Sequence, residues 1–182
     1  MLGKKILLAA IGLVILSVSL AVAEPPKDVE GWRQARWGMT ESQILEAFKG
    51  EAIRLDKGEK YDDNVYASVG INNFYLNGLP FSVRFVMDDY SRVLKRINIT
   101  LLDKRVSLSN FDDLKKMLIE KYGQPPLDNE RKDSLTNDYE TTWIFATTII
   151  ELKFAELRGL GMDKNLLKLF YRAKDKGDSD KL

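Results

Sequence analysis

Cysteine and histidine are both absent from the 182 residues of this chain. Without cysteine the fold has no disulfide bonds, so its stability has to come from a hydrophobic core. The two absences exclude Ser-His and Cys-His nucleophiles and remove the usual ligands of zinc, copper and haem. Side-chain chemistry is then limited to carboxylates, lysine, tyrosine or a hard cation such as calcium. We accordingly predict a protein that is not an enzyme and that uses no cofactor or metal.

The first 23 residues have the layout of a secretory signal peptide. Lys4 and Lys5 precede a nearly unbroken apolar run over residues 6–20, and small residues follow at Ala21 and Ala23. We predict cleavage after Ala23 and a periplasmic or secreted mature protein. The alternative is an uncleaved membrane anchor, for which the run is short, because a spanning helix needs about 20 apolar residues.

The charges of the chain are nearly balanced, with 28 basic and 27 acidic residues. Lys4 and Lys5 leave with the predicted signal peptide, so the mature chain has no basic excess to neutralise phosphates. We therefore expect no nucleic-acid partner. Residues 24–173 are long enough for one domain, and residues 174–182 form a polar tail that we expect to be flexible.

The clearest local signal in the chain is a helix start. Thr40 is placed to cap a helix over residues 41–49, and Gln43 three residues later completes a capping box. Met39 before the cap and Ile44 inside the helix are spaced as a hydrophobic staple. This pattern predicts a short helix with one apolar face.

Three strands are predicted after a charged loop at residues 55–64. The first covers residues 65–76, and Asn77-Gly78 favours a tight hairpin turn. The return strand alternates between apolar and polar residues, and a third strand covers about residues 93–102. The segment is expected to form a three-stranded meander.

The second half of the chain repeats this order. Ser109 is placed to cap a helix over residues 109–122, and Gly123 is placed to end it. A polar loop is predicted at residues 128–137. The strands that follow are predicted at residues 139–145, 148–155 and 166–172.

The expected fold class is α+β, with two αβββ units at about residues 32–103 and 107–173. The sheets are expected to be antiparallel meanders with the helices packed on one face. Each half is too small to bury much surface alone, so the halves either share one sheet or pack closely together.

Two short motifs resemble those of known protein families. Residues 37–44 (Trp-Gly-Met-Thr-Glu-Ser-Gln-Ile) resemble the Gly-Met-Thr helix start of small exported α/β modules. These include the small lipoprotein of the outer-membrane β-barrel assembly machinery and the β-lactamase inhibitor protein, which has two tandem α/β units. Residues 121–125 likewise resemble the Gly-x-Pro helix exit of such modules. The resemblance implies binding to proteins rather than catalysis, although the N-terminal cysteine of the lipoprotein is absent here.

Several acidic residues are candidates for metal binding or catalysis. The Asp62-Asp63 and Asp88-Asp89 pairs offer oxygen ligands to calcium, but neither pair has the spacing of an EF-hand loop, and Asp88-Asp89 falls where a hairpin turn favours aspartate. The carboxylates of the second half that are candidates for general acid–base catalysis are Asp138, Glu140 and Glu151.

Aromatic residues are the main candidates for partner binding, because aromatic side chains dominate interface hot spots. The residues that we predict to bind a partner are Trp32, Trp37, Met39, Tyr90 and Trp143. Our leading hypothesis is a non-enzymatic protein-interaction module that binds an envelope protein. The alternative is a binding protein for a small apolar or lipid-like ligand held between sheet and helices, and the third hypothesis is a carboxylate-dependent glycan hydrolase.

Overall fold

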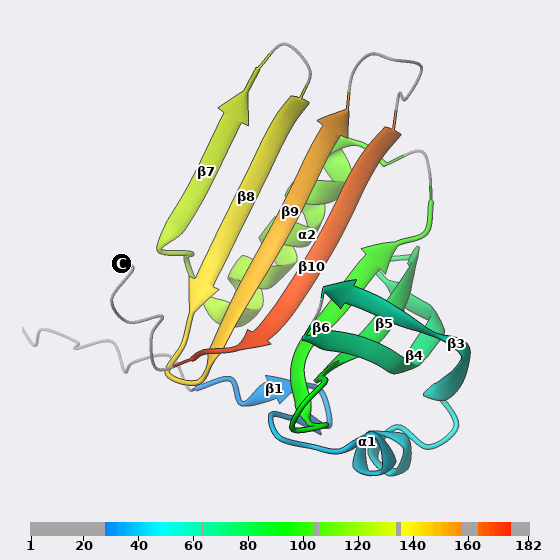
Figure 1. Ribbon diagram of the computed structural model, residues 1–182. Coiled ribbons are helices and arrows are strands. Elements are labelled where there is room, and N and C mark those ends of the chain that lie inside the picture. The colour runs from blue at the N-terminus through cyan, green and yellow to red at the C-terminus, as the bar shows by residue number, and fades with distance from the viewer. Residues whose placement is uncertain (1–27, 63, 104–105, 134–135, 158–163, 176–182) are drawn as a thin grey trace, which may run out of the picture.

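The computed structural model describes residues 28–62, 64–103, 106–133, 136–157 and 164–175. These residues form an eight-stranded antiparallel sheet, a small two-stranded sheet and two helices (Figure 1). The predicted signal peptide and residues 176–182 of the predicted tail lie outside the described residues, so both stay predictions. None of the helices in these ranges has the length and apolar character needed to cross a membrane.

The first half contains the predicted helix start. Thr40 Oγ1 accepts a hydrogen bond from the Gln43 backbone N–H, and the Gln43 side chain accepts one from the Thr40 N–H at 2.8 Å, which confirms the capping box. The elements of this half are β1 (Gly31–Trp32), β2 (Ala35–Arg36), α1 (Glu41–Ala47), β3 (Ile53–Asp62), β4 (Val65–Leu76), β5 (Leu79–Asp88) and β6 (Leu94–Leu101).

The predicted hairpin between β4 and β5 is also confirmed. Asn77 and Gly78 have φ values of 51° and 74°, the left-handed conformation that both central residues of a type I′ turn adopt. Asparagine and glycine enter this conformation at the lowest cost, which is why the pair fixes the turn and the register of the two strands.

The second half begins with a longer helix. Its cap is Ser107 rather than the predicted Ser109, and the Asn110 side chain accepts a hydrogen bond from the Ser107 N–H at 3.0 Å. The elements of this half are α2 (Leu108–Tyr122), β7 (Leu127–Lys132), β8 (Thr136–Ile144), β9 (Thr148–Leu157) and β10 (Lys164–Ala173).

The two halves share one sheet, with strand order β3-β4-β5-β6-β10-β9-β8-β7. Each half contributes four consecutive strands, and the halves meet where their last strands pair, with Leu169 opposite Ile99. The strands of the first half are twisted away from the flat array of β7–β10 (Figure 1). The question that the sequence left open is thereby settled in favour of a continuous sheet.

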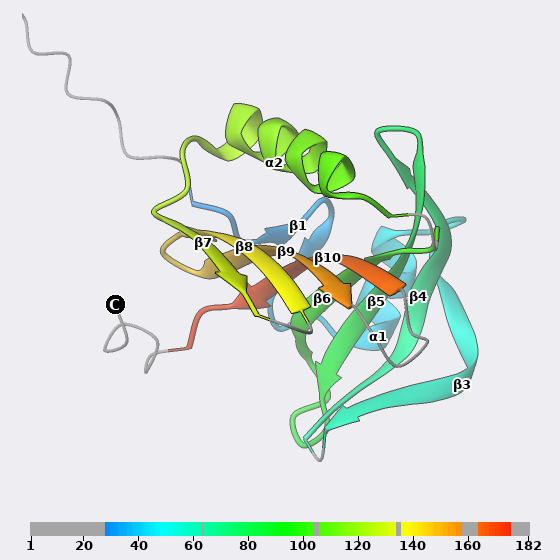
Figure 2. The same cartoon turned by 90° about the horizontal axis from the view of Figure 1, so that it is seen from above.

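One face of the sheet carries the hydrophobic core, and both helices pack against it. The strand register places Phe85, Ile97, Tyr171 and Ile150 in one buried row that crosses four strands. The ring of Phe48, just after α1, lies 5.1 Å from that of Phe85. Helix α2 covers the same face over β7–β10, as Figure 2 shows. We call this the core face and the opposite side the outer face.

The α+β prediction with two αβββ units is wrong. The described chain is mostly β, and each helix precedes four strands of a single sheet rather than three. The error lies in the predicted loops at 55–64 and 128–137, which are largely the edge strands β3 and β7. All six side chains of β7 are exposed, so this strand has no apolar side to produce the alternation by which a strand is recognised.

Candidate functional site

A short hairpin, β1–β2, places Trp32 against the core face. Its tight geometry requires Gly31, whose φ is 142° and where an added Cβ would lie 2.2 Å from the Ala35 carbonyl oxygen. Trp32 is buried, stacks on Phe48 at 5.9 Å and meets the edge of Phe74 at 5.3 Å. The hairpin therefore joins the end of α1 to the far end of β4.

Arg33, the next residue, is held in place over these rings. Its guanidinium carbon lies between 5.3 and 5.9 Å from the ring centroids of Trp32, Phe48 and Phe74. Two hydrogen bonds of 2.7 and 2.9 Å join it to the Glu51 carboxylate, and they hold the pKa of Glu51 below its usual value. Arg33 also has a left-handed backbone, with φ of 52°. Arg33 is the first residue of the two-residue turn between β1 and β2, and tight hairpin turns of this length require such a conformation.

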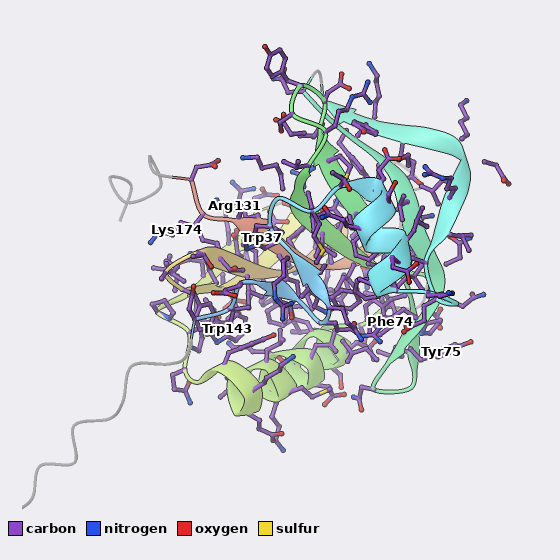
Figure 3. The ribbon with its side chains drawn as sticks, turned by 90° about the horizontal axis from the view of Figure 1, so that it is seen from below. Trp37, Phe74, Tyr75, Arg131, Trp143 and Lys174 are labelled. Atoms are coloured by element: carbon purple, nitrogen blue, oxygen red, sulfur yellow. The ribbon has the colours of Figure 1, made fainter. Side chains whose placement is uncertain are left out.

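An apolar crevice opens beside this cluster, between α2 and the β4–β5 hairpin. Its volume is about 160 Å³. Its walls and floor are apolar side chains from β1, β4, β6, α2 and β10, namely Trp32, Phe74, Leu76, Ile99, Leu114, Met117, Leu118, Leu169 and Tyr171. Phe74 and Tyr75 lie together near the tip of β4, apart from Trp37 and Trp143 (Figure 3).

Two cations stand where the crevice meets a wider, shallow basin of about 520 Å³. Arg33 and Lys121 line both hollows, and Arg36 lines the basin. The Lys121 ammonium lies 4.9 Å from the centroid of the Tyr122 ring. Within the described ranges, neither Lys121 nor Arg36 has a carboxylate within ion-pair distance. Lys121 therefore places at the rim of the apolar crevice a positive charge that no carboxylate of the described residues pairs with.

The five predicted partner-binding residues fall in different environments. Trp32 forms part of the crevice, and Trp37 is half-buried, donating a hydrogen bond of 2.7 Å to Thr148 Oγ1. Met39 is half-buried, Trp143 is only 1% exposed, and Tyr90 is 99% exposed at the β5–β6 turn. The structure thus does not gather them into one exposed surface, and their part in partner binding stays a prediction.

The candidate catalytic carboxylates lie on β8 and β9. Lys153 makes ion pairs of 3.0 Å with both Glu140 and Glu151, while Asp138 pairs with Arg131 at 2.9 Å. Burial of Lys153 disfavours its charged form, but the hydrogen bonds that it donates to Glu140 and Glu151 outweigh this effect and raise its pKa. Each candidate acid is thus paired with a cation, and Asp138 and Glu140 line a surface hollow of about 390 Å³ together with the cations Arg131 and Lys153.

The two acidic pairs considered as calcium ligands are Asp88-Asp89 and Asp62-Asp63, and the structure describes the side chains of the first pair only. Asp88 accepts hydrogen bonds of 2.7 Å from the backbone N–H and hydroxyl of Ser91, which keep its pKa below the usual value, as in a turn. The side chain of Asp62 and all of Asp63 lie outside the described residues. Among the residues whose positions are described, no group of three metal-ligating side chains occurs.

Phe74, Leu76, Arg33 and Lys121 were not identified as site residues from the sequence. The sequence contains one signal for Phe74 and Leu76. They lie in residues 69–83, which contain no charged side chain although 30% of the whole chain is charged. Nothing in the sequence places Arg33 and Lys121 together, since their proximity depends on how α2 crosses the sheet.

Comparison with protein-family models, with curated proteins and with solved structures found no match. The crevice and its charged rim must therefore be interpreted from their own chemistry.

Proposed function

We propose that this protein is an exported, non-enzymatic binding protein that holds a small apolar or lipid-like ligand in the crevice between α2 and the β4–β5 hairpin. The observation that carries the proposal is an open apolar crevice formed by five separate elements, with polar groups confined to its rim. This is the usual composition of a small-molecule site. The predicted signal peptide supports export.

Packing supports the same function. Protein interiors are normally filled to the density of organic crystals, and side chains that line a gap lose dispersion contacts on one side. The crevice lining includes Phe74, Leu76 and Met117, which are apolar and yet only half-buried. A ligand with an apolar group would restore these contacts.

The size of the crevice limits the ligand. Its volume of about 160 Å³ is below the usual range of roughly 300–1,000 Å³ for drug-sized ligands. One short alkyl chain fits this space, whereas a whole diacyl lipid does not. A longer molecule would extend into the adjoining basin.

The test uses two readouts. Native mass spectrometry of protein freshly purified from its host is expected to show a non-covalent adduct. Titration with uncharged 1-hexanol is expected to shift the NMR signals of Leu76, Ile99 and Leu118 saturably. Met117→Trp fills the crevice and should weaken hexanol binding at least about tenfold, since it removes the burial of two or more methylene groups.

Ile119→Trp is the matched control, because it enlarges a half-buried residue of the same helix that does not line the crevice. Circular dichroism verifies that both variants fold. If the wild-type protein shows neither an adduct nor saturable NMR shifts with hexanol, the proposed function is wrong. If Met117→Trp and Ile119→Trp weaken hexanol binding equally, the ligand does not bind in the crevice.

The uncovered outer face favours a second candidate, the envelope protein-interaction module. Both helices lie on the core face, so no helix of the described chain covers the outer side of β7–β10 (Figures 1 and 2). Arg131, Lys153 and Arg172 alternate there with carboxylates. Crosslinking from the native envelope should recover one protein near stoichiometry with wild type and with Lys116→Glu on α2, but not with Lys153→Glu. If the Lys153→Glu variant recovers the same protein as wild type, the outer face is not a protein-interaction surface.

A further inference from the structure

We infer that the ligand of the crevice is an amphipathic anion, a short alkyl chain that ends in a carboxylate or phosphate group bound beside Lys121, where the crevice meets the basin. This inference rests on the proposed function and adds to it the chemistry of the ligand's head group. It is drawn from the unequal distribution of charge and hydroxyl groups around the crevice.

The first argument is the uncompensated charge at the rim. Arg33 forms an ion pair with Glu51 through two hydrogen bonds. Lys121 and Arg36, in contrast, have no carboxylate partner in the described part of the chain. The Arg36 guanidinium instead donates to the backbone carbonyls of Arg33 and Ala35, at 2.6 and 2.9 Å. An anion would therefore meet two cations whose charge is not already neutralised.

Two acidic residues line the basin, and neither lines the crevice. Asp28 is engaged by Thr147, whose backbone N–H and hydroxyl donate to its two carboxylate oxygens at 3.1 and 2.8 Å. Glu30 also lines the basin and is exposed to solvent, as are Arg33, Arg36 and Lys121, so the charges of all four are screened. Lys121 and Arg33, in contrast, reach the crevice itself.

The second argument is a hydrogen-bonded pair of tyrosines, one of which lines each hollow. Tyr171 lines the crevice, Tyr122 lines the basin, and their oxygens lie 3.2 Å apart. Only one of the two hydroxyls donates within this pair, so the hydrogen of the other is left for a third group. Burial raises the pKa of Tyr171 well above its usual value, which keeps it protonated. An anionic oxygen at this junction would accept from a hydroxyl and from Lys121.

The volume of the crevice sets the length of the chain. A volume of about 160 Å³ is about five times the share of liquid volume that one water molecule occupies. A methylene group is of similar size, so about five or six carbons enter the crevice. The head group then falls at the rim, beside the cations.

The experiment compares four ligands with the same chain: hexanoate, hexyl phosphate, 1-hexanol and hexylamine. Each is titrated into the full protein at pH 7 and followed by NMR. We expect one or both anions to bind about tenfold more tightly than the alcohol, as charge-assisted hydrogen bonds exceed neutral ones. The amine should bind most weakly. Comparison of the two anions distinguishes a carboxylate from a phosphate site.

Variants test the role of Lys121. Lys121→Met keeps the alkyl stem and removes the charge, so it should abolish most of the anion preference and leave hexanol binding within about twofold. Lys116→Met, on the exposed side of the same helix, should change neither. A carboxylate series from butanoate to octanoate should gain about fourfold per methylene and level off near six carbons.

The outcomes separate the two proposals. Equal affinity for hexanol and both anions, or an anion preference that survives Lys121→Met, would overturn the anion inference and leave the proposed function standing. If none of the four ligands binds, both fail. A carboxylate series that gains nothing with length would show an ion bound at the rim alone, which also contradicts the inference.

Discussion

At the scale of single residues, Glu41 joins helix α1 to the sheet. Its carboxylate accepts hydrogen bonds from the Tyr66 hydroxyl at 2.9 Å, the Ser68 hydroxyl at 2.6 Å and the Arg54 guanidinium at 2.9 Å. Burial alone would raise the pKa of Glu41, but the bonds from Ser68, Arg54 and Tyr66 outweigh it and lower the pKa. The position also suits an acid, because the first turn of a helix favours negative charge.

We expect Glu41→Gln to lower the free energy of unfolding at pH 7 by about 1–2 kcal/mol, since it weakens three hydrogen bonds to a charged acceptor. The folded pKa lies below the unfolded value of about 4.3. The contribution is therefore complete above that pH and is lost as the pH falls through the folded pKa. Urea denaturation from pH 7 to pH 3 should show the difference between wild type and variant shrinking below about pH 4.3.

Glu46→Gln provides the matched control, because Glu46 is exposed on the same helix. A surface substitution of this kind is expected to change stability by less than about 0.5 kcal/mol. A wild-type-to-Glu41→Gln difference that does not vary with pH would contradict the assigned role of the carboxylate.

At the scale of elements, the contact between β4 and β5 depends on Gly70. A Cβ at this position would lie 2.6 Å from the Val83 carbonyl oxygen and 2.9 Å from the Arg84 side chain. The oxygen belongs to the backbone of the paired strand, which cannot move aside without disturbing the ladder. We expect Gly70→Ala to cost about 1–3 kcal/mol of stability, as overpacking does, measured by urea denaturation.

Gly58 on β3 is the matched control for this substitution. Its added Cβ would meet the Ala67 carbonyl oxygen at 3.6 Å, an ordinary van der Waals contact. Gly58→Ala should leave stability unchanged or raise it by up to about 1 kcal/mol, because alanine restricts the unfolded chain. Equal effects of the two substitutions would show that backbone approach is not the cause.

The elements differ in how far the sequence predicts them. The capping box at Thr40 and the turn at Asn77-Gly78 are local signals, and both predict the structure correctly. Strands β3 and β7 are at the two edges of the sheet and carry few buried side chains, so periodicity cannot show them. Edge strands of this polar kind resist pairing with other chains, and that same polarity conceals them in the sequence.

The candidate site could be predicted only in part. Trp32 is one of the residues that the sequence predicts to bind a partner, and it forms part of the crevice. The remaining lining comes from distant segments, such as Phe74, Met117 and Leu169, that meet only once the two halves share a sheet. Their apolar character is visible in the sequence, but the gap between them is a property of packing.

At the scale of the whole molecule, the shared sheet makes the halves depend on each other. The core residues of both halves form one cluster, and β6 of the first half pairs along its length with β10 of the second. A domain built in this way is expected to unfold in a single cooperative step.

We predict that Phe48→Ala in the first half and Phe154→Ala in the second each lower the stability of one common transition by about 3–5 kcal/mol, the cost of removing a buried phenylalanine. Tryptophan fluorescence and far-ultraviolet circular dichroism should give coincident urea curves for both variants. Tyr90→Ala, at a fully exposed position, should leave the curve unchanged. Separate midpoints for the two probes would show that the halves unfold independently.

The central place of β10 has a consequence for the order of assembly. It is the last strand of the described chain, yet it lies between β6 and β9 in the middle of the sheet. As the chain is synthesised from its N-terminus, seven of the eight strands exist before the one that joins them, and β6 and β9 both have open apolar edges until it arrives. Such edges favour misassembly during folding. The two halves of the sheet therefore join at its centre, and they do so only after β10 has been synthesised and can pair with β6 and β9.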